Sequence, residues 1–329
     1  MNIKTPFSGG RRLDVPVLSG QTVAGLLSVD EAIEAVERSF MLAARGETVM
    51  PPKLYLDLPR YEGDFRAMPA YIDGMAGIKW VSVHPGNPGR HLPTVQALIV
   101  LNDPATGRML AIMDGTYITT LRTGAAGAVA VKYLARKDSR VIGIIGAGQQ
   151  GKTQLSAISR VWPRLELAVV YDIKKSASLD YVREMKEKVK FEIRTAGSIE
   201  EAAGADIVVA ATPARMPIIK EGHIRPGTHI NAIGADAPGK QELESGLVGR
   251  SRVIVDDIEQ AVHSGEVNVP LSEGAITRGH IAGTLGEVIT GALEGRRSRD
   301  EITIFDSTGL AIHDIICARS VYLKARGNK

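Results

Sequence analysis

A glycine-rich turn between an aliphatic run and a helical stretch is the feature that most restricts the fold of this chain. Val141–Ile145 leads directly into Gly146-Ala-Gly-Gln-Gln-Gly151, and an amphipathic segment follows. In this spacing Gly146 permits a tight turn, Gly148 lets the backbone approach a pyrophosphate, and Gly151 lets the helix pack on the strand. The amides of the first helical turn would face the phosphates with the positive end of the helix dipole. The pattern therefore predicts the start of a dinucleotide-binding α/β domain.

Strand and helix patterns alternate after this turn. The apolar strand candidates lie at 165–171, 205–211, 229–233, 253–255 and 302–305. Strands that alternate with helical segments form βαβ units and a parallel sheet. We therefore predict an α/β fold whose NAD-binding domain, residues 126–309, is a Rossmann-type doubly wound parallel sheet.

The chain ahead of the glycine turn has a different texture. A capped amphipathic helix is expected at 28–40, because Ser28 and Glu31 form a capping box. Strand patterns follow at 53–58, 76–83, 95–101 and 109–113. Polar turns between them predict an antiparallel sheet of hairpins. We expect residues 1–125 to form an α+β domain, completed by a C-terminal helix at 310–329.

Composition excludes several classes of protein. The net charge of +3 is too small to indicate a nucleic-acid partner, and the longest aliphatic stretches are far shorter than a membrane span. The cluster of Arg296, Arg297 and Arg299 is expected to end a helix. The single cysteine, Cys317, lies among apolar residues and is expected to be buried. One cysteine leaves no internal disulfide and fits a reducing compartment, so we expect a cytoplasmic protein.

The end of the second predicted strand bears on the choice of cofactor. Asp172 follows that strand, 21 residues after Gly151. A carboxylate there would accept hydrogen bonds from the ribose hydroxyls and repel a 2′-phosphate, which favours NAD. Lys174 and Lys175 would suit a 2′-phosphate, so NADP stays open. Thr212 ends a further strand at the edge of the sheet where the cofactor is expected.

Further motifs recur along roughly residues 20–325. They are Met68-Pro-Ala70, Gly77-Ile-Lys79, Leu92-Pro-Thr-Val-Gln96, Asp103-Pro-Ala-Thr-Gly107, Asp114-Gly115, Leu121-Arg-Thr-Gly124, Gly234-Ala-Asp236 and Phe305-Asp-Ser-Thr-Gly-Leu-Ala311. Together they resemble the ornithine cyclodeaminase/μ-crystallin family, and most of all its archaeal-type alanine dehydrogenase branch. The resemblance implies a first domain for substrate binding and dimerisation, hence a homodimer. It also implies hydride transfer between nicotinamide and the α-carbon of a small amino acid or imine.

The resemblance assigns roles to individual residues. Lys79 and Asp236 fall on the catalytic positions, and Lys79 also binds substrate. Lys53, Arg66 and Thr308 fall on or beside positions that hold the substrate, although the family usually has arginine where this chain has Lys53. With the glycine turn, the expected cofactor contacts are Thr94, Arg122, Gly146, Gly148, Gln149, Gln150, Gly151, Asp172, Thr212, Ala232, Ile233, Gly234, Ala235, Lys240 and Ser307.

The residue types agree with these roles. An amino acid substrate requires cations for its carboxylate, and conversion of an amine to an imine requires a group that shuttles protons near neutral pH. Lys79 would have a depressed pKa if another cation crowded it. Arg66 and Met68 would share one strand face and pair with the stretch that carries Lys79. His84 and His91 lack a further ligand at recognisable spacing, so no metal is expected.

Arg66 favours one reaction of the family over the others. Ornithine cyclodeaminases carry glutamate there, which suits the distal amine of ornithine. An arginine would repel that ammonium and adds a grip on a carboxylate, which favours an NAD(H)-dependent, alanine dehydrogenase-like enzyme. Three alternatives stay open: an ornithine cyclodeaminase, a reductase of cyclic ketimines such as pyrroline- or piperideine-2-carboxylate, and a non-catalytic, crystallin-like binding protein.

Overall fold

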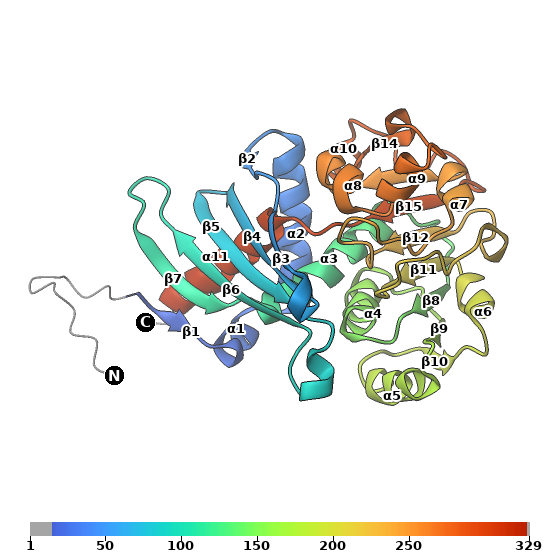
Figure 1. Ribbon diagram of the computed structural model, residues 1–329, viewed down its shortest axis with the longest axis horizontal. Coiled ribbons are helices and arrows are strands. Elements are labelled where there is room, and N and C mark those ends of the chain that lie inside the picture. The colour runs from blue at the N-terminus through green and yellow to red at the C-terminus, as the bar shows by residue number, and fades with distance from the viewer. Residues whose placement is uncertain (1–14, 328–329) are drawn as a thin grey trace, which may run out of the picture.

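The computed structural model describes residues 15–327, which form two parts, each built on its own sheet (Figure 1). The first part carries a mostly antiparallel sheet, and the second a parallel sheet with helices on both faces. The predicted fold class is confirmed. No helix within residues 15–327 is long and apolar enough to cross a membrane.

The first sheet has seven strands in the order β1-β7-β6-β5-β4-β2, with β3 also paired to β4. The strands are β1 (Val17–Leu18), β2 (Thr48–Val49), β3 (Leu54–Leu58), β4 (Gly63–Ile72), β5 (Met75–Val83), β6 (Val95–Asn102) and β7 (Met109–Asp114). All pairs are antiparallel except β1 with β7. The four expected strands correspond to β3, β5, β6 and β7. The long strand β4 lies between β3 and β5 in the sequence and pairs with both.

Strand alternation in β4 decides which side chains face the core. Arg66, Met68, Ala70 and Ile72 are buried on one face. The predicted hairpin with β5 is confirmed, and it places Met68 directly opposite Lys79. Because residues opposite each other share a face, Arg66 and Lys79 point to the same side of the sheet.

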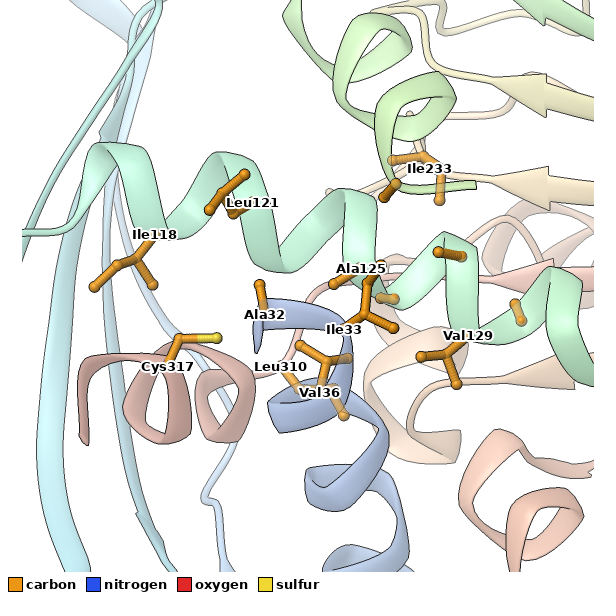
Figure 2. Close-up of a cluster of buried hydrophobic side chains, with 14 of the residues drawn as sticks. Ala32, Ile33, Val36, Ile118, Leu121, Ala125, Val129, Ile233, Leu310 and Cys317 are labelled. Atoms are coloured by element: carbon orange, nitrogen blue, oxygen red, sulfur yellow. The ribbon is translucent and has the colours of Figure 1, made fainter. Parts of the chain in front are cut away.

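Three helices pack against this sheet: α1 (Gly20–Leu26), α3 (Thr116–Leu134) and α11 (Ala311–Gly327). A fourth helix, α2 (Val29–Ala44), packs on α3 and α11. The capping box of Ser28 and Glu31 starts α2 as predicted. α11 returns from the second part and packs on α2, α3, β4, β5 and β6. Figure 2 shows the apolar side chains of α2 and α3 meeting beside Cys317 of α11, which is fully buried as expected.

α3 runs across the predicted domain boundary at residue 125. Asp114 accepts the Thr116 N–H at 2.8 Å, so the helix begins two residues after β7. Small residues in its second half allow close packing on α4: a Cβ on Gly127 would lie 1.9 Å from the Gln154 amide oxygen. α3 contacts both α2 and α4, which belong to different parts. The division at residue 125 therefore stays a prediction.

The second sheet has eight parallel strands in the order β10-β9-β8-β11-β12-β15-β13-β14. They are β8 (Val141–Ile145), β9 (Leu167–Tyr171), β10 (Glu192–Thr195), β11 (Ile207–Ala210), β12 (His229–Ala232), β13 (Arg252–Val255), β14 (Ile281–Thr284) and β15 (Thr303–Asp306). The helices are α4 (Gln149–Val161), α5 (Lys175–Met185), α6 (Ile199–Ala203), α7 (Ser245–Gly249), α8 (Ile258–Ser264), α9 (Asn268–Ser272) and α10 (Leu285–Thr290). The chain runs outward from β8 on one side and resumes at β11 on the other, so the order reverses beside β8. Ligands of such sheets bind at this switch point, beyond the carboxyl ends of the strands.

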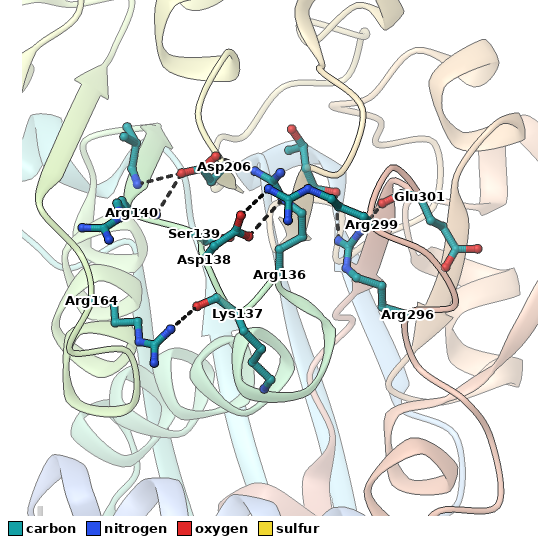
Figure 3. Close-up of polar contacts among 12 residues, drawn as sticks. Arg136, Lys137, Asp138, Ser139, Arg140, Arg164, Asp206, Arg296, Arg299 and Glu301 are labelled. Atoms are coloured by element: carbon teal, nitrogen blue, oxygen red, sulfur yellow. Dashed lines mark hydrogen bonds and ion pairs between the residues drawn. The ribbon is translucent and has the colours of Figure 1, made fainter.

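Arginines form ion pairs and hydrogen bonds at the amino ends of the parallel strands, opposite the switch point (Figure 3). Arg136 pairs with Asp206 at 2.7 Å, and Arg299 pairs with Asp138 at 2.5 Å. Arg296 donates to the Leu134 carbonyl at 2.8 Å. The prediction that this arginine cluster ends a helix is wrong. α10 ends at Thr290 because Gly291 takes a left-handed conformation (φ +79°), and the arginines lie in the loop that follows.

Candidate active site

A cavity of about 220 Å³ lies where the inner face of β4 and β5 meets the carboxyl ends of the parallel strands. Twelve of the expected site residues line it, from both parts of the chain. They are Lys53, Arg66, Lys79, Arg122, Gln150, Thr212, Ile233, Gly234, Asp236, Lys240, Ser307 and Thr308. Cationic side chains of the first part therefore lie across this cavity from the carboxyl ends of the parallel strands.

Lys79 projects from β5 into a buried ion cluster. Its Nζ lies 2.7 Å from one carboxylate oxygen of Asp314 on α11, and the Nε of Arg122 lies 3.1 Å from the other. Burial and the Arg122 guanidinium lower the pKa of Lys79 to about 7, against the opposing effect of Asp314. Arg122 is thus the crowding cation that the sequence left unspecified. A lysine with this pKa can both hold and release a proton near neutrality.

Arg66 and Asp236 form a second ion cluster on the other side of the cavity. Arg66 binds Asp64 through two hydrogen bonds (2.6 and 3.2 Å) and reaches Asp236 at 3.0 Å. Lys240 contacts the other oxygen of Asp236 at 2.6 Å. Desolvation would raise the pKa of Asp236, but Arg66 and Lys240 hold it well below its ordinary range. The carboxylate is therefore an anion at neutral pH.

The glycine turn has the shape that its sequence predicts. Gly146 adopts φ +104°, and a Cβ there would lie 2.5 Å from the Ala211 carbonyl oxygen. A Cβ on Gly148 would meet no atom of the described chain within 4 Å, which leaves space in front of α4. No side chain of residues 15–327 caps that helix, so its first amides are free to face an anion. These features fit a dinucleotide pyrophosphate.

The sequence model of the ornithine cyclodeaminase/mu-crystallin family matches residues 14–329 of this chain. The chain belongs to this family. The resemblance seen in the motifs is therefore confirmed.

Three relatives are similar to this chain over nearly its whole length. Alanine dehydrogenase of Archaeoglobus fulgidus is 49% identical over 314 residues, covering 95% of this chain and 96% of its own length. A solved archaeal alanine dehydrogenase dimer with bound NAD is 48% identical with a TM-score of 0.92, covering 95% of this chain and 97% of that one. The Δ1-pyrroline-2-carboxylate reductase of Thermococcus litoralis, solved with NADH and L-proline, is 42% identical with a TM-score of 0.93, covering 95% and 98%.

In this family member Lys53 is fixed by the loop after β15. Its Nζ donates to the Thr308 carbonyl at 2.5 Å, and burial lowers its pKa to about 8. Asp256, at the end of β13, accepts the Thr308 hydroxyl at 2.9 Å and the Gly309 N–H at 2.8 Å. The loop Ser307–Gly309 is thereby held against the cavity from two sides.

The remaining expected cofactor residues do not line this cavity. Gly146, Gly148, Gln149 and Gly151 form the turn, and Ala232 and Ala235 flank the end of β12. Asp172 accepts the N–H groups of Ala147 and Lys174, each at 2.9 Å, so it also braces the turn. Thr94 precedes β6, where its carbonyl accepts the His84 N–H at 2.8 Å. The cofactor roles of these residues stay predictions.

Three buried carboxylates were not among the expected site residues. Glu242 accepts the Thr212 and Gly234 N–H groups at 2.7 and 2.9 Å, and so joins two of the cavity walls. Asp256 and Asp314 hold the walls described above. A sequence signal existed for two of them: Asp256 follows the apolar strand β13, and Asp314 interrupts the apolar face of α11. A carboxylate within an apolar run is buried with a partner, but the sequence does not say which partner.

Proposed function

We propose that this chain is an NAD(H)-dependent oxidoreductase that acts on the α-carbon of an amino acid or its imine, with alanine dehydrogenase-like chemistry. One observation carries the proposal: Lys79, with a pKa of about 7, and the anionic Asp236 line one cavity beside a dinucleotide turn. Conversion of an amine to an imine needs a group that gains and loses a proton near neutral pH, and this arrangement supplies one. The similarity to an archaeal alanine dehydrogenase supports it.

The proposed cofactor site follows from the geometry of the turn. Gly146, Gly148 and Gly151 would bring backbone amides to the pyrophosphate, and Asp172 would bind the adenosine ribose. Thr212 and the segment Ala232–Ala235 would border the nicotinamide half, together with Arg122, Lys240 and Ser307. When bound, NAD supplies the hydride acceptor of the reaction.

The protein's own groups would bind the substrate and move its protons. Lys53, Arg66, Lys79 and Arg122 offer cations to the substrate carboxylate, and Thr308 adds a hydroxyl beside it. Asp236, as an anion, would take the proton from the substrate amine or from the water that hydrolyses the imine. Lys79 would carry the second proton, because its pKa lies near neutrality.

A cyclic ketimine reductase is the second candidate. Met68, Val81, Val83 and Val95 form an apolar wall of the cavity, which suits either a methyl group or an aliphatic ring. The 42% identical neighbour solved with NADH and L-proline is a Δ1-pyrroline-2-carboxylate reductase. Both candidates share the same proton and hydride steps and differ in the side chain of the substrate.

A panel of substrates tests the proposal. NADH oxidation, followed by its absorbance, should occur with pyruvate plus ammonia or with Δ1-pyrroline- or Δ1-piperideine-2-carboxylate. The preferred substrate separates the two candidates. Ornithine converted to proline without net NADH formation would establish the cyclodeaminase alternative. NADH binding without turnover of any of these compounds would establish the crystallin-like alternative.

We also propose a cytoplasmic homodimer formed through the outer face of the first sheet. Leu54, Ala67, Trp80 and Leu98 are successive partners across four strands, on the face opposite Lys79. Leu54, Trp80 and Leu98 are 63%, 41% and 42% exposed. A contiguous exposed apolar row of this kind marks a protein interface. An archaeal relative was solved as a dimer.

Cofactor choice is predicted from Asp172. NADH should bind at least about tenfold more tightly than NADPH, because the carboxylate binds ribose hydroxyls and repels a 2′-phosphate. Fluorescence titration of both nucleotides measures the ratio. Asp172→Ala should narrow it, whereas Lys174→Ala should leave it unchanged. Equal affinities for NADH and NADPH in the unaltered protein would contradict this role of Asp172. They would indicate that Lys174 and Lys175 bind the 2′-phosphate and would favour NADP.

A further inference from the structure

The carboxylate of Asp314 pairs with two cations that line the cavity, Lys79 and Arg122. Asp314 is fully buried, and the side chains of Lys79 and Arg122 are 1% and 8% exposed. The two carboxylate oxygens are divided, with Oδ2 at 2.7 Å from Lys79 Nζ and Oδ1 at 3.1 Å from Arg122 Nε. The three residues come from β5, α3 and α11, so the contact forms only when α11 has returned to the first sheet.

The charged and titratable groups that act on Lys79 come from three segments of the chain. α11 contributes Asp314 and His313, α3 contributes Arg122, and the segment ahead of β3 contributes Lys53. His313 is neutral, because burial lowers its pKa to about 3. Asp314 is thus the anion that balances Arg122 and Lys53 around this lysine.

We propose that Asp314 is a positioning residue for the proton-transferring Lys79: it holds the lysine with one oxygen and Arg122 with the other, so that both cations face the same cavity. The inference rests on the proposed function, because it concerns the lysine assigned to proton transfer there. It adds a residue to which the sequence motifs assign no role.

The charge of Asp314 has a consequence that its shape alone does not have. Without an anion, two buried cations repel each other, and the one that can lose its proton is Lys79. Asp314→Asn keeps the size of the side chain but removes the charge. Lys79 should then lose its proton at a lower pH. Arg122→Gln removes a neighbouring cation and should move the lysine in the opposite direction.

Competitive acetylation of the chain without cofactor measures this shift directly. The fraction of Lys79 modified by acetic anhydride is followed by mass spectrometry from about pH 5 to about pH 10, with the exposed Lys175 as internal reference. The midpoint of Lys79 should fall by about one pH unit or more in Asp314→Asn and rise in Arg122→Gln. The matched control is Asp206→Asn, which removes a carboxylate that pairs with Arg136 at 2.7 Å, at the other end of the parallel strands. In this control the midpoint of Lys79 should equal its midpoint in the unaltered chain.

The outcomes separate this inference from the proposed function. An unmoved midpoint in folded Asp314→Asn, or in Arg122→Gln where the asparagine variant does not fold, overturns the role of Asp314. A moved midpoint in a chain without any redox turnover overturns the proposed function and leaves the positioning role standing. In an active chain, the pH at which kcat changes should shift with the labelling midpoint, whereas a merely structural loss would lower kcat equally at every pH.

Discussion

Asp236→Asn is expected to lower kcat by about 100-fold or more while NADH affinity stays within about threefold. Asparagine keeps the size of the side chain and a hydrogen-bonding oxygen for Arg66 or Lys240, which now lie 3.0 and 2.6 Å from the carboxylate. It cannot accept a proton. The loss should therefore fall on turnover rather than on cofactor binding, and steady-state kinetics with a parallel NADH titration measure both.

Asp64→Asn is the matched control, because Asp64 also pairs with Arg66 but does not line the cavity. It should keep most of the turnover. Turnover of Asp236→Asn within a few-fold of the unaltered protein would make Asp236 a structural turn residue that only anchors Arg66 and Lys240.

The two proton-transfer groups also predict how activity depends on pH. Asp236 is ionised throughout the neutral range, because its pKa is held well below the ordinary value. Of these two groups, it is Lys79, with a pKa of about 7, that titrates between about pH 6 and 8. Reduction requires the protonated lysine and should weaken as pH rises through this range. Oxidation of the amino acid requires the neutral lysine and should strengthen.

Local periodicity carried most of the fold. The glycine turn and the alternation after it were enough to predict the parallel sheet, because each βαβ unit is specified within a few tens of residues. The strands β10 and β14 were not predicted, since they lie at the two edges of the sheet and neither Glu-Ile-Arg-Thr nor Ile-Ala-Gly-Thr is a continuous aliphatic run. The position of α11 followed from the resemblance and from its apolar pattern.

The candidate site was predicted in its membership but not in its pairings. Lys79, Arg66 and Asp236 were expected as site residues. The sequence does not show that Asp314 pairs with Lys79 or that Asp236 pairs with Arg66, because these partners are separated by 235 and 170 residues along the chain. Arg66 was treated as an unpaired cation, and the structure shows it bound by two carboxylates. Such pairings depend on the docking of β4 and β5 against the ends of β12 and α11.

The pairing of Arg66 bears on the last prediction, which concerns the choice of reaction. Arg66 is clamped by Asp64 and Asp236 and lies 5.3 Å over the Tyr55 ring, so its guanidinium is fixed beside the cavity. Lys79 faces the same cavity from β5. The residues that line the cavity include one carboxylate, Asp236, and the cations Lys53, Arg66, Lys79, Arg122 and Lys240. This lining suits a substrate with one carboxylate and one amine, whereas the distal ammonium of ornithine would enter at a repulsive cost of several kcal/mol where it is poorly solvated. NADH should therefore reduce pyruvate plus ammonia or a cyclic imine acid, with little or no proline formed from ornithine.

Arg66→Glu should weaken keto-acid or imine-acid reduction by about 100-fold or more, and any gain of turnover should be with diamines. The glutamate would place a third carboxylate beside Asp64 and Asp236 and repel the substrate carboxylate. Arg66→Lys is the matched control: it keeps the charge but cannot bind Asp64 and Asp236 together, so its loss should be smaller and should fall mainly on KM. Rapid conversion of ornithine to proline by the unaltered chain, without net formation of NADH, would contradict this choice. In that case Asp236, rather than Arg66, would set the charge that the substrate meets in the cavity, and the cyclodeaminase reaction would follow.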